Sequence, residues 1–203
     1  MPVVKQVTLY SFDELSEEAQ QRAIETVRGW NFNLFDECDE SFVLGNFVSD
    51  NPHIEDMDIS YSSGFYSRGD GASFTGSIGS EWLIEFFAKN VNDELKTLLR
   101  EVQVSFARSS SRYVHSNTVS SELDDSDIVW ADHIEENDIL KDRMIENYLE
   151  DMRQAIEDYR IDLCGTIYRT LEKAYHDCYS DENIAELIRT NEYLFDEYGD
   201  FVE

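Results

Sequence analysis

Four side chains that could coordinate a divalent cation follow Pro52, namely His53, Glu55, Asp56 and Asp58. Imidazole nitrogen and carboxylate oxygen are common metal ligands, but an EF-hand needs the pattern D-x-[DN]-x-[DN]-G with a glutamate at its twelfth position, and this pattern is absent from the sequence. We therefore predict a solvated loop here, with no metal site and no cofactor. A cation bound between His53 and Asp58 is the alternative.

A glycine-rich segment, residues 64–71, lies between two predicted strands. It differs from a phosphate cradle because it does not lead from a strand into a helix and contains no lysine. Glycine and aspartate at residues 69–71 favour a turn that needs positive φ angles. We predict a turn-forming scaffold, with a partner-contact loop as the alternative. The contact residues would be Phe65, Tyr66, Arg68 and Asp70.

The other histidines do not form a recognisable catalytic arrangement. His115 has no candidate nucleophile and base beside it in the sequence, and His133 and His176 lack HExxH or comparable spacing. The sequence also contains no GxSxG, Walker A or Rossmann pattern. We predict a protein without catalytic residues. The alternative is an enzyme with a site around Arg68, Asp70 and His115.

Acidic residues dominate the polar part of the chain. Its 203 residues include 44 Asp and Glu against 16 Lys and Arg, a formal net charge of −28. Residues 113–140 contain no Lys or Arg, and acids then recur every four residues at Asp138, Asp142, Glu146 and Glu150. On a helix this spacing makes a row of carboxylates, and each like-charged pair costs about 0.2–0.5 kcal/mol. Folding alone does not favour that row.

This charge pattern predicts a surface that captures a basic protein. Direct nucleic-acid binding is excluded because phosphate affinity comes from clustered Lys and Arg, and an anionic membrane surface is disfavoured for the same reason. The net charge is comparable to that of a DNA duplex about as long as the protein is wide, which favours DNA mimicry. An ordinary solvated helix face, with basic residues between the acids, is the alternative. The predicted partner-binding residues are Glu122, Asp124, Asp125, Asp127, Asp132, Glu135, Glu136, Asp138, Asp142, Glu146 and Glu150.

The elements that must position these groups indicate an α+β fold, with a small, mostly antiparallel sheet, packed helices and a long helical C-terminal third. Residues 1–120 are predicted to form an α+β core with two hairpins, and residues 121–203 an acidic helical region that packs on this core within one domain. The expected strands are residues 3–10, 58–61, 72–78, 102–106 and 113–119; the expected helices are residues 16–27, 30–48, 81–99, 139–178 and 180–191.

The longest of these helices carries an apolar stripe from Leu149 to Cys178, in steps of three or four residues. A straight helix over residues 139–178 would be roughly 60 Å long. A globule of this size should be only about 43 Å across. We therefore expect the helix either to protrude or to break, with Gly165 as the hinge.

Cysteine usage and the distribution of apolar residues bear on the compartment. Cys38, Cys164 and Cys178 are odd in number and form no CxxC pair, which predicts buried free thiols in a reducing compartment. The N-terminal residues lack the uninterrupted apolar segment of a signal peptide. The most apolar patch, residues 82–88, is far shorter than the roughly 20 residues that span a bilayer. We expect a cytoplasmic protein.

Four segments of the sequence are distinctive. They read YSFDELSEEA (residues 10–19), YSSGFYSRGDGASF (61–74), RYVH (112–115) and SDENIAELIRTNEY (180–193). These segments resemble a family of small acidic phage proteins often labelled "antitoxin of toxin–antitoxin stability system", and the glycine-rich segment is the most specific of them. The resemblance implies a phage origin and a protein target in the cytoplasm of a bacterial host, and it brings no catalytic residues to transfer.

Charge and resemblance together predict a non-enzymatic phage protein that binds and inhibits a basic host protein. The target class would be nucleic-acid-handling or defence proteins, as for anti-restriction and anti-CRISPR inhibitors. An antitoxin that neutralises a toxin protein is the alternative, and a homodimer stays open.

Overall fold

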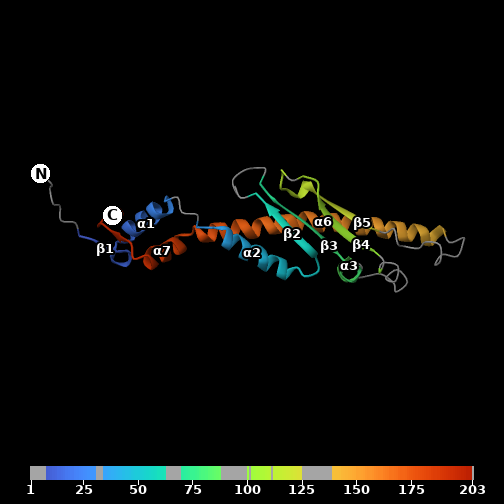
Figure 1. The fold of residues 1–203 in the computed structure, drawn as a ribbon, viewed down its shortest axis with the longest axis horizontal. Helices are drawn as coiled ribbons and strands as arrows, with labels where there is room; N and C mark the ends of the chain where they lie inside the picture. The colour runs from blue at the N-terminus through green and yellow to red at the C-terminus, as the bar shows by residue number, and fades with distance from the viewer. Residues whose placement is uncertain are drawn as a thin grey trace. The chain divides into compact units, whose positions relative to one another are not determined.

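The computed structural model describes residues 8–30, 34–62, 70–87, 100, 102–110, 112–124 and 139–202. These residues form an α+β fold, which confirms the predicted fold class (Figure 1). The strands are β1 (Tyr10–Ser11), β2 (Glu55–Tyr61), β3 (Ala72–Ile78), β4 (Gln103–Arg108), β5 (Val119–Asp124) and β6 (Leu194–Phe195). The α-helices are α1 (Glu17–Arg28), α2 (Glu37–Asp50), α3 (Ser80–Phe87), α6 (Ile139–Cys178) and α7 (Asp181–Thr190), and the short 3-10 helices are η1 (Phe12–Glu14) and η3 (Ser116–Thr118).

The chain divides into two compact units, which are not consecutive along the sequence. The terminal unit combines residues 1–41 and 172–203, and the central unit comprises residues 42–171. Helices α2 and α6 each contribute residues to both units. The boundary expected near residue 120 falls inside β5.

The terminal unit has a hydrophobic core built from both ends of the chain. Apolar side chains of α1 and α7 are buried together with Phe12 of η1 and Phe195 of β6. Arg189 near the end of α7 pairs with Asp13 at 2.9 Å, and β1 pairs antiparallel with β6. Local sequence starts both helices: Ser16 caps α1 and Ser180 caps α7, each by accepting a hydrogen bond from a backbone N–H three residues on.

The central unit is built on a four-stranded antiparallel sheet in the order β2-β3-β4-β5. Gly76 of β3 lies opposite Phe106 of β4, which lies opposite Ser121 of β5. Alternation along β4 buries Val104 and Phe106 and exposes Gln103, Ser105 and Ala107, as the period of a strand requires. The buried stripe of α6 includes Leu149, Met152, Ile156, Leu163, Ile167 and Leu171, which confirms the expected apolar stripe.

One expected strand is absent, and one of the two alternatives expected for the long helix does not occur. Residues 113–119 do not form a strand, because His115 and Thr118 exchange side-chain and backbone hydrogen bonds that close the turn η3, and β5 begins only at Val119. Helix α6 does not break at Gly165. A single glycine costs only about 1 kcal/mol in a helix, and the buried stripe on both sides of it outweighs that cost.

Several expected elements reach beyond the described residues. The strand over residues 3–10 is described only from residue 8, and the helix over residues 81–99 only as far as Phe87. Among the described residues, no helix combines the length and the apolar character needed to cross a bilayer. Of the three cysteines, Cys164 is buried and Cys178 is half-buried, both as free thiols. The side chain of Cys38 lies outside the described residues.

Candidate functional site

The predicted partner-binding residues fall into three groups. Glu122 and Asp124 lie on β5, Glu146 and Glu150 lie on α6, and all four are exposed. We call these four residues the acidic edge. Asp142 belongs to α6, but its side chain lies outside the described residues. The remaining members lie wholly outside them: Asp125, Asp127, Asp132, Glu135, Glu136 and Asp138.

Strand β5 and helix α6 run in opposite directions beside each other. Arg160 of α6 contacts the backbone carbonyl of Ser116 just before β5, and the hydroxyl of Ser121 donates to the carboxylate of Glu157 at 3.3 Å. Residues further along β5 therefore contact residues closer to the N-terminus of α6.

This direction puts one residue from each half of the acidic edge at the same level. Three residues beyond Ser121 cover about 10 Å of strand. The seven residues from Glu157 back to Glu150 cover about 10 Å of helix. Asp124 on β5, the outer strand of its sheet, is thus level with Glu150 of α6.

Basic residues neutralise the acidic edge only in part. Arg153 lies 3.5 Å from Glu150, but an exposed pair of this kind contributes only about 0–1 kcal/mol. Within the described residues, Glu122 and Glu146 form no ion pair. Two of the four carboxylates of the acidic edge therefore keep their charge without an ion pair in the part of the chain that the structure describes.

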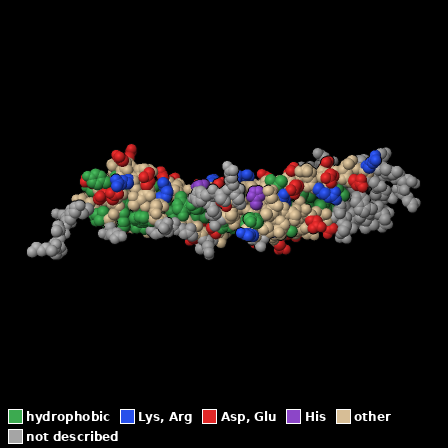
Figure 2. Space-filling view, turned by 90° about the horizontal axis from the view of Figure 1, so that it is seen from above, with side chains coloured by type: hydrophobic (Ala, Val, Ile, Leu, Met, Phe, Trp, Pro, Cys, Tyr) green, Lys and Arg blue, Asp and Glu red, His purple; other side chains and the backbone are tan. Residues whose placement is uncertain are grey.

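Acids are not confined to this edge. Figure 2 shows acidic side chains, with basic ones between them, over the face that it displays. Counted over the sequence, the terminal unit holds 19 acids and 5 bases, and the central unit 25 acids and 11 bases. Each unit thus carries a net charge of −14, and the smaller terminal unit has the higher charge density.

The segment after Pro52 is not the solvated loop that the sequence predicts. His53 is 9% exposed, and its Nε2 lies 2.6 Å from the hydroxyl of Tyr159 on α6. Burial lowers the pKa of His53 and raises the pKa of Tyr159 to about 12. The acids that follow belong to β2, and no group of three or more His, Cys, Asp or Glu in the described part of the chain could hold a metal ion. No signal in the sequence pairs His53 with Tyr159.

A cavity of about 310 Å³ brings Asp70 and His115 together. Its other lining residues include Asp162, Tyr168 and Arg169, which lie on one flank of α6. Residue type alone groups Asp70 with His115, whereas the contribution of α6 to the cavity depends on the packing of the helix against the sheet. Phe65, Tyr66 and Arg68 lie outside the described residues.

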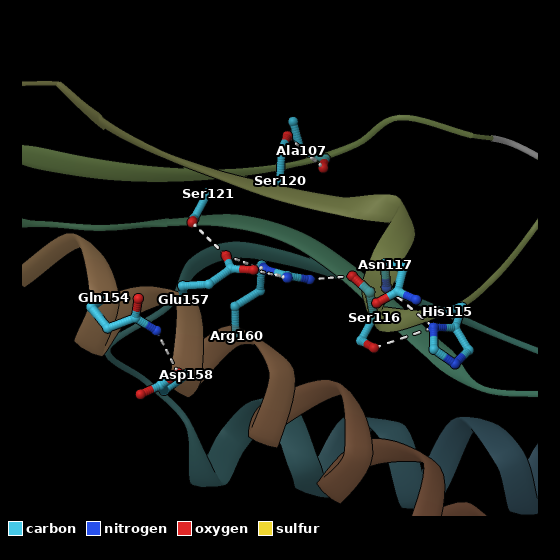
Figure 3. Close-up of polar contacts among 10 residues, drawn as sticks. All are labelled: Ala107, His115, Ser116, Asn117, Ser120, Ser121, Gln154, Glu157, Asp158 and Arg160. Carbon is cyan, nitrogen blue, oxygen red and sulfur yellow. Dashed lines mark hydrogen bonds and ion pairs between the residues drawn. The ribbon is translucent and has the colours of Figure 1, made fainter.

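The imidazole of His115 is held in one orientation. Its Nδ1 accepts the backbone N–H of Asn117 at 3.2 Å and lies 3.2 Å from the hydroxyl of Ser116 (Figure 3). Since Nδ1 accepts a hydrogen bond from a backbone N–H, the neutral ring carries its own proton on Nε2. His115 can therefore donate a hydrogen bond from the side of the ring that faces away from the turn.

A buried arginine supports this turn from α6. Arg160 is 4% exposed, donates to the carbonyl of Ser116 and pairs with Glu157, as Figure 3 shows. The hydrogen bonds with Arg160 lower the pKa of Glu157 and raise that of Arg160. Nearby, burial raises the pKa of the Cys164 thiol to about 11. That thiol stays protonated at neutral pH, so it is a poor nucleophile.

Residues 30–181 match a family model described as "Domain of unknown function (DUF8835)". The match includes the whole central unit and leaves out α1 and all but the first residue of α7. No curated protein and no solved structure matches the chain.

Proposed function

We propose that this chain, which belongs to the family of unknown function that it matches, is a non-enzymatic phage protein. It would bind and inhibit a basic, nucleic-acid-handling protein of a bacterial host. The phage origin and the bacterial cytoplasm rest on the resemblance described above. The class of partner rests on charge, because proteins that bind phosphate backbones present clustered Lys and Arg.

The observation that carries this proposal is the acidic edge. Glu122 and Asp124 are exposed on the face of β5 that points away from α6, and Asp124 is level with exposed Glu150 of that helix, so carboxylates flank the outer strand of the sheet. Carboxylates distributed in this way on a rigid surface attract a basic partner over long range and orient it before contact. Such association weakens as the salt concentration rises.

The test compares two variants of equal charge. The edge variant combines E122Q, E146Q and E150Q, and the control variant combines D151N, D158N and E55Q, three exposed acids elsewhere in the central unit. Proteins retained from a bacterial lysate at low salt and released at high salt are identified, purified and titrated against each variant. We expect the edge variant to bind about tenfold more weakly, with a shallower salt dependence, and the control to bind like the wild type.

Equal loss of affinity in both variants would show that only total charge matters. Unchanged affinity and salt dependence in the edge variant would overturn the proposal outright. If the partner is instead a dedicated toxin, the chain is an antitoxin, and co-expression of the two proteins would restore growth.

The enzymatic alternative around Arg68, Asp70 and His115 is favoured by one observation, the cavity that Asp70 and His115 share. The protonated thiol of Cys164 offers no nucleophile there. The cavity is better suited to binding than to nucleophilic catalysis.

A further inference from the structure

Three aromatic side chains from separate parts of the chain meet in the terminal unit. Trp30 follows the end of α1, Tyr193 follows the end of α7, and Phe201 forms a β-bridge with Phe195. We call Trp30, Tyr193 and Phe201 the aromatic corner. The acidic edge belongs to the central unit, so the proposed capture of a basic protein does not use these three rings.

The rings of the aromatic corner stand nearly perpendicular to one another. The ring centroid of Trp30 lies 5.4 Å from that of Tyr193 and 4.8 Å from that of Phe201, with interplanar angles of 67° and 78°. Tyr193 and Phe201 complete the set at 5.7 Å and 79°. Three planes at such angles enclose a corner, and a group on its open side faces all three rings.

The aromatic corner covers the core without being sealed itself. Phe195 and Ile188 in the core are 0% exposed, whereas each of the three rings packed against this core is half-buried. Figure 2 shows hydrophobic and acidic side chains next to each other at the surface of the terminal unit. Aromatic surface is therefore accessible to a ligand.

The face of an aromatic ring attracts a cation, because the π electrons make that face negative. From the three centroid distances, a point about 4 Å above their plane lies about 5 Å from each centroid, within the roughly 6 Å over which a cation and a ring attract each other. A primary ammonium group is strongly hydrated and needs hydrogen-bond acceptors. A quaternary ammonium group has no N–H, is round and apolar at its surface, and so fits a site walled by three rings.

The charges of the terminal unit also favour a cation. The unit carries a net charge of −14 and so attracts cations from solution. Arg28, two residues before Trp30, pairs with Asp181, which offsets its positive charge. Glu192, directly before Tyr193, is exposed.

The backbone at Glu192 is unusual for a glutamate. Its φ is +52°, in the left-handed region that glycine most often occupies after a helix. The backbone N–H of Tyr193 donates to the carbonyl of Ile188 at 3.2 Å and closes this turn. Glycine would form the same turn with less strain, whereas glutamate adds a carboxylate next to the aromatic corner.

We propose that the aromatic corner binds a quaternary ammonium group. A trimethylammonium group rests against the faces of the three rings, the charge of Glu192 adds attraction, and the rest of the ligand extends into solvent. A small choline-like molecule and the side chain of a trimethylated lysine both carry this group, and the test separates the two sources.

The first test uses the unaltered full chain. Choline and a short peptide with one trimethylated lysine are titrated by calorimetry and proton NMR, beside 3,3-dimethyl-1-butanol, which has the shape of choline without its charge. We expect choline or the peptide to bind about tenfold or more tightly than the neutral analogue, with the methyl resonance shifted upfield by the three rings. The tighter of the two charged probes identifies the source. Absence of binding by both at millimolar concentration, or equal binding of the neutral analogue, would overturn the proposal.

Variants of the rings then locate the site. Trp30→Leu and Tyr193→Leu each remove one aromatic wall and keep apolar cover over the core, so each should weaken binding about tenfold. The control is Tyr113→Leu, at an exposed tyrosine of the central unit, which should bind like the wild type. Wild-type affinity in both folded ring variants would refute the site.

A charge variant gives a test that does not disturb the core. Glu192→Gln should weaken binding about threefold. The matched control is Glu17→Gln, which removes an exposed carboxylate at the start of α1, about 20 Å along the helix from Trp30. Equal affinities of the two variants would contradict the assignment. Because the acidic edge is untouched in all of these variants, failure here leaves the partner-binding proposal standing.

Discussion

The buried guanidinium group of Arg160 donates a hydrogen bond to the backbone carbonyl of Ser116, so helix α6 holds the turn that orients His115. The same arginine pairs with Glu157, which in turn accepts the hydroxyl of Ser121 on β5 (Figure 3). One side chain thus joins the helix, the turn and the outer strand of the sheet.

Replacing Arg160 with methionine should lower the free energy of unfolding by about 1–3 kcal/mol, because the carbonyl of half-buried Ser116 and the carboxylate of Glu157 lose the donor that buried Arg160 supplies. Urea denaturation measures this change. The control is Arg153→Met, which removes the exposed pair with Glu150 and should cost less than about 1 kcal/mol. Equal losses in the two variants would contradict a special role for Arg160.

Stability should fall as the pH drops below about 6.5, the ordinary pKa of histidine. Burial lowers the pKa of His53 in the folded protein, so the unfolded chain binds its proton first, and protonation pulls the equilibrium toward unfolding. The contribution is complete above pH 6.5 and is lost progressively as the pH falls toward the folded pKa. As the pH is lowered from about 8 to about 5, the urea midpoint of His53→Gln should fall less than that of the wild type. The control is His176→Gln, at an exposed position. If the urea midpoint of His53→Gln falls with pH as steeply as that of the wild type, protonation of His53 is not the cause of the loss.

Removing the hydroxyl of Tyr159 should destabilise the fold, because Nε2 of His53 loses a buried partner at 2.6 Å. We expect Tyr159→Phe to cost about 1–2 kcal/mol in thermal or chemical denaturation. Tyr198→Phe, at an exposed position, should change stability by less than about 0.5 kcal/mol. A neutral effect of Tyr159→Phe would mean that this hydrogen bond contributes nothing to stability.

Gly199→Ala should loosen the terminal unit. Gly199 has a φ of +85°, and a Cβ atom there would lie 2.1 Å from the carbonyl oxygen of Ala19, so the chain must move. We expect a loss of more than about 1 kcal/mol, with faster hydrogen exchange in α1 and α7. The matched control is Gly45→Ala in α2, where nothing lies within 4 Å, and it should stabilise the protein by about 0.5–1 kcal/mol. Unchanged exchange in α1 would contradict the close approach.

Much of the secondary structure was predictable because its causes are local. Ser16 and Ser180 cap helices through hydrogen bonds to residues three positions away, and alternation from Val102 to Phe106 marks a buried strand face. The stripe of α6 likewise needs only the period of a helix. The expected strand over residues 113–119 is absent because the side chains of His115 and Thr118 close a turn that alternation does not reveal.

The candidate site was only half predictable. The acidic residues and the pair of Asp70 and His115 follow from residue type, because charge is a property of composition. How α6 lies along the sheet decides that Asp124 is level with Glu150. It also decides that Tyr168 and Arg169 line the cavity.

By itself, therefore, the sequence determined the fold class, the helix starts, the apolar stripe and the negative charge. Tertiary structure alone decided that the two termini share one core, that His53 is buried against Tyr159, and that α6 completes a cavity with the start of β3. The physical reason is the range of the interactions. Capping and periodicity act over three or four residues, whereas a core or a cavity depends on contacts between segments that are distant in the chain and meet only when the whole chain packs.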